Sequence, residues 1–157
     1  MSAQGGSTPD QAWTLEVYES ADGSSAWTTS FQDLDPVGQM VLQTALRVVL
    51  ARLGNKVCET EWGKSLGKGL YEFRVRRTLA TICRTHNVDV PPGVDPDRTV
   101  LLRAFFSVEG ERVVLLLSCY DKGADSSDRR QAREIKKARK LLTEHLEHQR
   151  RLKARRR

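Results

Sequence analysis

The chain has 157 residues, of which 39% are hydrophobic and 29% charged, so it can form the apolar core of one domain and is not a disordered chain. Its 26 Lys and Arg outnumber its 20 Asp and Glu, which gives a formal net charge of +6 at pH 7. No apolar run is long enough to span a membrane, the first ten residues lack the basic and apolar regions expected of a secretory signal, and three widely separated cysteines do not suggest a disulfide framework. Together with the scattered histidines, these features predict a cytoplasmic protein that holds no metal and no cofactor.

The first third of the chain predicts a short strand followed by a helix. Residues 1–12 are small and polar, which indicates a flexible leader. Residues 13–18 alternate apolar and polar side chains, as in a half-buried strand. Asp35 is a suitable N-cap before a proline and Gly54 is a suitable C-terminal stop, so a helix is expected over residues 36–53.

The middle of the chain predicts a basic loop and then a second strand. Residues 62–69 contain three glycines together with Lys64 and Lys68, so residues 55–69 are expected to form a mobile basic loop. The loop lacks the spacing of a phosphate-binding loop, which disfavours a nucleotide triphosphatase. Residues 70–77 alternate again, with Arg74 and Arg76 on the face opposite the apolar side chains.

The second half predicts two further strands and a long helix. Residues 78–98 are expected to be an insertion loop, whose first part up to His86 could also be a short helix or a strand extension. Residues 100–107 and 112–120 predict a hairpin with a glycine in its turn. A long helix with apolar residues at helical spacing is expected after residue 128.

This order of elements predicts an α+β fold, with a small, mainly antiparallel sheet packed against helices. Residues 13–147 are expected to form the single domain, followed by a basic tail at residues 148–157. The positive charge is concentrated at this end, because residues 129–157 hold 13 basic and 3 acidic side chains. Such a block indicates phosphate-bearing or acidic partners, although a solvated helix face with a basic end is the alternative.

From about residue 66 onward the chain resembles the RelE/ParE superfamily of bacterial toxins, in particular its HigB-like, phage-derived branch. The preceding helix, with its start at residues 34–36 and its end at Leu53-Gly54, also resembles that family, so the likeness covers about residues 13–140. The chain differs in the insertion at 78–98, in a lysine pair reduced to Lys122-Gly123, and in a longer basic C-terminal extension. The matching segments, in order, are Gly69-Leu-Tyr-Glu-Phe-Arg74, Leu102-Arg-Ala-Phe-Phe106, Gly110-Glu-Arg-Val-Val-Leu-Leu-Leu-Ser-Cys-Tyr120, Lys122 and Glu134-Ile-Lys-Lys-Ala-Arg139.

The resemblance implies a toxin that cuts mRNA on the ribosome. In such a reaction a ribose 2′-hydroxyl attacks the adjacent phosphate, so the enzyme supplies alignment, cationic groups and proton transfer. The catalytic residues that the resemblance implies are Arg74, Arg103, Tyr120 and Lys122. The residues expected to bind RNA are Lys64, Lys68, Arg76, Arg129, Arg130, Arg133 and Lys137. The expected partners are the ribosome, mRNA and an antitoxin protein with a helix-turn-helix, and no membrane.

Two other functions remain open at this point. The chain can be a toxin of the same fold that blocks a protein such as DNA gyrase, or a catalytically inactive nucleic-acid or regulatory binding module. The residues themselves also have structural interpretations. Arg74 and Arg76 can be ordinary strand residues that pair with glutamates, and Arg103 in its apolar strand can belong to a structural ion pair. Lys122 can be a turn lysine, and Tyr120 can pack at the end of the sheet.

Overall fold

The first strand of the chain pairs with the last one, so the two ends of the strand sequence lie side by side in the sheet. The computed structural model describes residues 12–156. The first half contains β1 (Thr14–Val17), α1 (Ala26–Gln32), α2 (Pro36–Ala45), the π-helical turn η2 (Leu46–Leu50), α3 (Ala51–Leu53) and the 3₁₀ helix η3 (Gly54–Glu59). The second half contains β2 (Gly63–Gly67), β3 (Leu70–Thr78), α4 (Leu79–Thr85), β4 (Thr99–Glu109), β5 (Val113–Asp121) and α5 (Asp128–Arg155).

The five strands form one sheet in the order β1-β5-β4-β3-β2. β1 runs parallel to β5, and the other neighbours are antiparallel. This arrangement confirms the predicted α+β fold with a mainly antiparallel sheet. A bulge in β5 places Leu117 as an extra residue, because Phe105 pairs with Ser118 while Phe106 pairs with Leu116. Beyond the bulge, each residue of β5 lies on the face of the sheet opposite to the one that regular alternation would give it.

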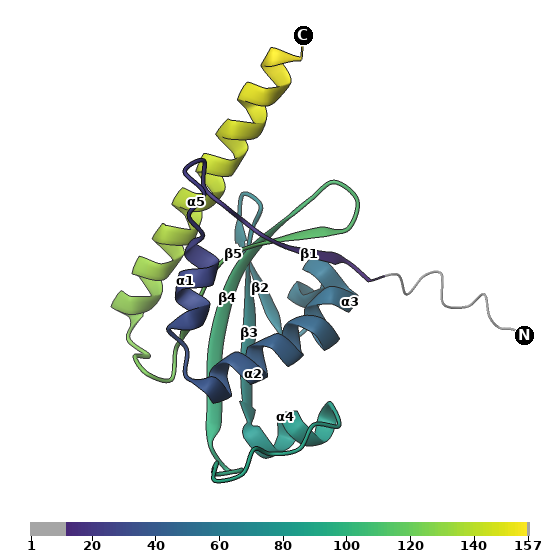
Figure 1. Ribbon diagram of the computed structural model, residues 1–157, viewed down its shortest axis with the longest axis vertical. Helices are drawn as coiled ribbons and strands as arrows, with labels where there is room; N and C mark the ends of the chain where they lie inside the picture. Colours follow the sequence, from purple (N-terminus) through teal and green to yellow (C-terminus); the bar gives the residue numbers. More distant parts are fainter. Residues whose placement is uncertain (1–11, 157) are drawn as a thin grey trace, which may run out of the picture.

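Helices cover both faces of the sheet (Figure 1). α1, α2, η2 and α4 bury one face in the larger core, which contains Leu42, Phe73 and Phe106. α5 packs on the other face over a smaller core, in which Ala138 and Leu142 meet Leu70, Phe105, Leu117 and Tyr120. The sheet therefore has no fully solvated face, and charged residues that point toward α5 lie beneath a helix.

The helix expected over residues 36–53 is confirmed as the continuous run of α2, η2 and α3. The Asp35 carboxylate accepts the Gly38 backbone N–H at 2.7 Å, which caps the start of α2 as its sequence predicts. At the other end Gly54 has φ +56°, and a Cβ there would overlap the indole of Trp13. A glycine is therefore required both for the turn and for the close approach of the N-terminal strand.

α5 is the longest element, and its C-terminal turns extend beyond the sheet (Figure 1). Ala138 and Leu142 are buried, whereas Leu146 and Leu152 are exposed. The segment expected to be a basic tail, residues 148–157, is helical through Arg155, and the helix has no break at the expected boundary. Most of the expected leader, residues 1–11, lies outside the described residues, as does residue 157.

The structure corrects one segment of the sequence interpretation and decides between the alternatives for another. Residues 55–69, predicted as a loop, contain most of η3 and the edge strand β2. β2 has a glycine-rich sequence with little strand preference of its own, and it forms because Lys64 and Ser65 pair with Glu72 and Tyr71 of β3. Residues 78–98 begin with α4, which fits the short-helix alternative for the stretch up to His86.

No helix among residues 12–156 combines the length and the apolar character that crossing a membrane requires.

Candidate active site

Three of the four residues expected to be catalytic lie side by side across the sheet. The register pairs Arg74 of β3 with Arg103 of β4, and Arg103 with Tyr120 of β5. Directly opposed residues of an antiparallel pair project from the same face, so the three side chains form a line, here called the cross-strand row. The bulge at Leu117 turns Tyr120 toward α5 and so brings it into this row.

Glu72 lies next to the cross-strand row and was not among the residues expected from the sequence. Its side chain is fully buried, and its Oε1 accepts a hydrogen bond from Arg74 Nε at 2.7 Å. Its Oε2 has no hydrogen-bond partner in the described part of the chain. The alternation of β3 does place Glu72 on the same face as Arg74, but its burial depends on α5, which lies more than 50 residues further along the chain.

Arg103 is buried, with 6% of its surface exposed. Its Nη1 donates to the Leu102 carbonyl at 3.2 Å, and its Nε has no partner within residues 12–156. Burial lowers the pKa of Arg103, and the nearby Glu72 carboxylate raises it. An arginine stays protonated under these conditions, so the two guanidinium groups outnumber the single Glu72 carboxylate beside them and the row carries a net positive charge.

Tyr120 is also buried and is held from both sides. Its ring stacks on Phe105 with the centroids 6.1 Å apart, and the Arg130 guanidinium lies 5.0 Å from its ring centroid. Arg130 is fixed in turn by Glu134, one turn later on α5, at 2.9 Å. Burial raises the pKa of Tyr120, whose hydroxyl has no partner among the described residues. The hydroxyl is therefore protonated near neutral pH and can act as a hydrogen-bond donor.

Lys122, the fourth residue expected to be catalytic, does not join the cross-strand row. It follows the end of β5, and its backbone N–H donates to the Leu101 carbonyl at 2.9 Å. Its side chain is half-buried and makes no ion pair with any residue of the described chain.

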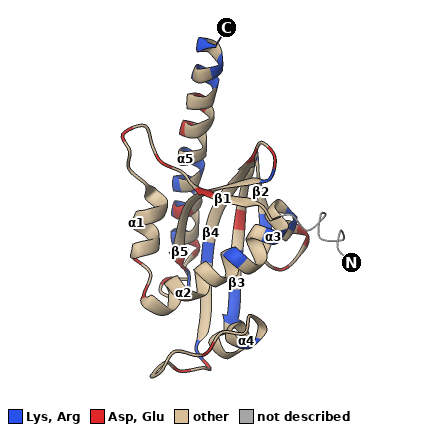
Figure 2. Ribbon diagram, turned by 45° about the vertical axis from the view of Figure 1, so that its right-hand side comes forward, with Lys and Arg blue, Asp and Glu red and all other residues tan. Residues whose placement is uncertain are grey.

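The residues expected to bind RNA are mostly exposed and border the α5 face. Lys64 lies opposite Glu72 on the edge strand, Lys68 occupies the turn after β2, and Arg76 follows Arg74 on β3. Arg130 is the exception, because it is half-buried over Tyr120. On α5 the exposed members are Arg129, Arg133 and Lys137, which contribute to the basic character of this helix in Figure 2.

Arg139 of α5 has a structural role that the sequence did not suggest. Its two terminal nitrogens donate to the carbonyls of Gly67 and Leu66 at 2.9 and 3.0 Å. These bonds connect the helix to the outer edge of β2, where backbone carbonyls would otherwise lack partners from a neighbouring strand. α5 is thereby fixed over the cross-strand row.

Three cavities in the described part of the chain lie away from the cross-strand row. Those of about 690, 400 and 750 Å³ are lined by other residues. Access to the row is by its partly open end, where the Arg74 side chain is 30% exposed and Arg76 is exposed. The row is therefore open to solvent only at Arg74 and its neighbour Arg76, whereas Arg103 and Tyr120 lie beneath α5.

The described residues contain no group of three or more His, Cys, Asp and Glu side chains placed to hold a metal ion. The fold and the cross-strand row define an α+β protein with a positively charged polar site that is largely covered by α5. Comparisons with protein-family models, with curated proteins and with solved structures gave no match.

Proposed function

We propose that this protein is the toxin of a toxin–antitoxin system and cuts ribosome-bound mRNA in the cytoplasm. The observation that supports this most directly is the cross-strand row, in which Arg74, Arg103 and Tyr120 come together from three strands. The order of motifs that resembles the RelE/ParE superfamily, and the basic residues around the row, support it as well. The protein needs no nucleophile of its own, because the RNA supplies the 2′-hydroxyl.

The chemistry assigns a distinct task to each buried group. Two guanidinium groups match the oxygens of one phosphate and stabilise the charge that builds up on it as the 2′-oxygen attacks. The Tyr120 hydroxyl is protonated and can donate to the leaving 5′-oxygen. In this proposal Oε2 of Glu72, which has no partner among the described residues, accepts the 2′-hydroxyl proton. A phosphate would enter beside Arg76 and Arg74, where the row is open.

Expression in bacterial cells tests the proposal. We expect growth arrest together with mRNA cuts inside translated frames, read out by primer extension. Purified protein should cut mRNA in a ribosome complex much faster than the same RNA alone, because the ribosome supplies the alignment that this small site lacks. Equal rates on naked and ribosome-bound RNA would contradict a ribosome-dependent mechanism, and growth arrest without mRNA cuts would contradict cleavage altogether.

The burial of the row favours one alternative, a binding protein without catalysis. Arg103 and Tyr120 are 6% and 3% exposed, so little of either side chain is open to a substrate, as in a structural polar cluster. Such a protein would act by binding nucleic acid or by blocking a protein such as DNA gyrase. In that case growth arrest would persist in a folded variant that lacks the Arg103 guanidinium.

We also propose an antitoxin as the protein partner, because the exposed basic side chains of α5 suit an acidic segment that folds on binding. Co-expression with a neighbouring helix-turn-helix gene should give a stable complex on a sizing column and should restore growth. Elution of the two proteins as separate monomers would contradict this assignment.

The end of α5 is expected to contribute to RNA or ribosome binding without taking part in the chemical step. Residues 150–157 carry Arg150, Arg151, Lys153, Arg155, Arg156 and Arg157 and no acidic residue. Deleting them should weaken binding and reduce the slope of log affinity against log salt by up to about 4, at roughly 0.7 for each phosphate that is no longer neutralised. Gln149 is kept because it donates to Glu109 at 2.8 Å and helps to fix the helix on the domain.

The measurements are a salt series of binding constants and single-turnover cleavage at saturating ribosome complex. A matched control replaces the exposed Leu152 by Gln and leaves all of the charges in place. An unchanged salt dependence in the truncated protein would show that these side chains do not contact phosphates.

A further inference from the structure

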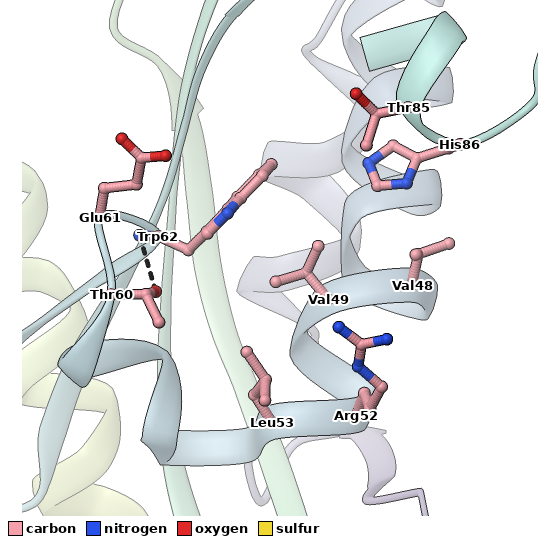
Figure 3. Close-up of a pocket in the computed structure, with 9 residues that line it drawn as sticks. All are labelled: Val48, Val49, Arg52, Leu53, Thr60, Glu61, Trp62, Thr85 and His86. Carbon is pink, nitrogen blue, oxygen red and sulfur yellow. Dashed lines mark hydrogen bonds between the residues drawn. The ribbon is translucent and has the colours of Figure 1, made fainter.

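A hollow of about 690 Å³ lies on the side of the sheet opposite the cross-strand row. Three segments form its walls: the helix through η2 and α3, the turn that leads into β2, and the C-terminal end of α4 (Figure 3). Arg52, Glu61 and Thr85 are exposed at its mouth, so the hollow is open to solvent. The proposed RNA cleavage makes no use of this part of the molecule.

The inner part of the hollow is apolar and rigid. Val49 is buried, Leu53 is half-buried, and the Trp62 indole forms the facing wall (Figure 3). Trp62 stacks on Phe73 with the ring centroids 5.9 Å apart, and the Arg77 guanidinium lies 4.8 Å from its ring centroid. The indole is therefore fixed before any ligand arrives, which reduces the entropy that binding would cost.

The mouth of the hollow carries unpaired positive charge. Arg52 makes no ion pair with any residue among 12–156, and its guanidinium borders the hollow in Figure 3. Burial lowers the pKa of His86, and Arg47 lowers it further, so the ring is neutral near pH 7 and the unpaired positive charge comes from Arg52. The acidic residue of the lining, Glu61, is already paired with Arg77.

We propose that this hollow binds an acidic, amphipathic peptide segment of a partner protein. A bulky apolar side chain of that segment would pack between Trp62 and Val49, and a neighbouring carboxylate would pair with Arg52. This combination matches the apolar floor and the cationic mouth. An RNA base fits less well, because Phe73 and Arg77 already pack on the Trp62 ring. The inference does not depend on the proposed RNA cleavage.

The test uses the full chain labelled with ¹⁵N and a synthetic probe. The probe is an acetylated 14-residue peptide of Glu, Leu and Phe with its apolar residues at helical spacing; the control peptide has Lys at every Glu. The indole N–H signals of Trp13, Trp27 and Trp62 report three separate regions of the chain. We expect the acidic peptide to shift the Trp62 signal saturably below about 1 mM, and the Lys peptide to shift it little.

Two charge reversals make the test specific. Arg52→Glu should weaken peptide binding by about tenfold or more, since it replaces an attractive charge by a repulsive one. Arg84→Glu, an equal change at an exposed position of α4 that does not line the hollow, should alter the affinity less than about twofold. Arg52 is exposed and unpaired in the described chain, so the fold should survive its replacement.

Four results would overturn the proposal. They are equal binding of the Lys peptide, no loss of affinity in Arg52→Glu, peptide-induced shifts on α5 in place of Trp62, and no binding up to about 1 mM. A short single-stranded RNA that shifts the Trp62 signal and competes with the peptide would assign the hollow to nucleic acid instead. The result of the RNA-cleavage experiments does not affect any of these outcomes, because the peptide titration measures binding at the hollow and not catalysis.

Discussion

Replacing Arg103 by Met is expected to slow mRNA cleavage by roughly 10²–10³, which corresponds to about 3–4 kcal/mol of lost transition-state stabilisation. Arg103 lies between Arg74 and Tyr120 in the cross-strand row, and its Nε has no partner among the described residues. A phosphate bound beside Arg103 would accept a hydrogen bond from this Nε, which has no acceptor in the described chain. Single-turnover cleavage at saturating ribosome complex measures the effect.

The same substitution is expected to change the free energy of unfolding by less than about 1 kcal/mol. Met keeps most of the aliphatic volume of Arg, and the change removes a buried donor that has no partner. Arg74 keeps its bond to Glu72 at 2.7 Å, so no charge loses its partner. Arg84→Met, at an exposed position of α4, is the matched control and should leave cleavage intact.

Two outcomes would reject the catalytic assignment of Arg103. A folded Arg103→Met protein with full activity would show that the guanidinium does not contact the reacting phosphate. An unfolded or strongly destabilised variant would instead assign Arg103 to the structural polar cluster beneath α5. In the second case Arg74, which is 30% exposed, would be the arginine left to bind phosphate.

Replacing Glu72 by Gln is expected to destabilise the fold by roughly 3 kcal/mol, the lower end of what breaking a buried ion pair costs. Glu72 is fully buried, pairs with Arg74 and stabilises the charge of Arg103, so its neutralisation leaves two neighbouring guanidinium groups without this counter-charge. The partial exposure of Arg74 lets water screen some of this repulsion, which places the effect at the lower end. Urea unfolding measures it.

Glu61→Gln is the matched control for this prediction. Glu61 also pairs with an arginine, Arg77, but its side chain is 70% exposed. Water screens that pair, and its loss is expected to cost less than about 1 kcal/mol. Equal effects of the two substitutions would show that the burial of Glu72 does not strengthen its ion pair. A stabilised Glu72→Gln protein would show that the desolvation of the carboxylate outweighs its attraction to the two arginines.

The strongest local patterns of the sequence predicted elements that the structure confirms. Alternation predicted β1 and β3, the glycine turn predicted the β4–β5 hairpin, and Asp35 with Gly54 predicted both ends of the second helical segment. These patterns are reliable because hydrogen bonding and side-chain alternation within a few residues determine them. β2 escaped prediction because its glycine-rich sequence becomes a strand only through pairing with β3.

Three residues of the candidate site, Arg74, Arg103 and Tyr120, were singled out in the sequence, but Glu72 and the surroundings of all four were not. Arg74 was visible as a charge in an alternating strand and Arg103 as a charge in an apolar strand, and the register then brought them opposite one another. The importance of Glu72 was hidden, because a glutamate in an alternating strand has the same local pattern whether water or a helix covers it. Only the position of α5, held to β2 by Arg139, makes Glu72 and Arg103 buried.

The sequence by itself therefore determined the α+β class, the main strands and helices, and the concentration of basic charge at the C-terminal end, since each depends on local pattern or composition. The tertiary structure decided which charges meet and which are covered. Tyr120 shows the reason most clearly: strict alternation along β5 would place it on the same face as Val114 and Leu116. The bulge at Leu117 shifts the alternation by one residue and turns Tyr120 toward Arg103. That shift arises from pairing with β4, which no local pattern within β5 specifies.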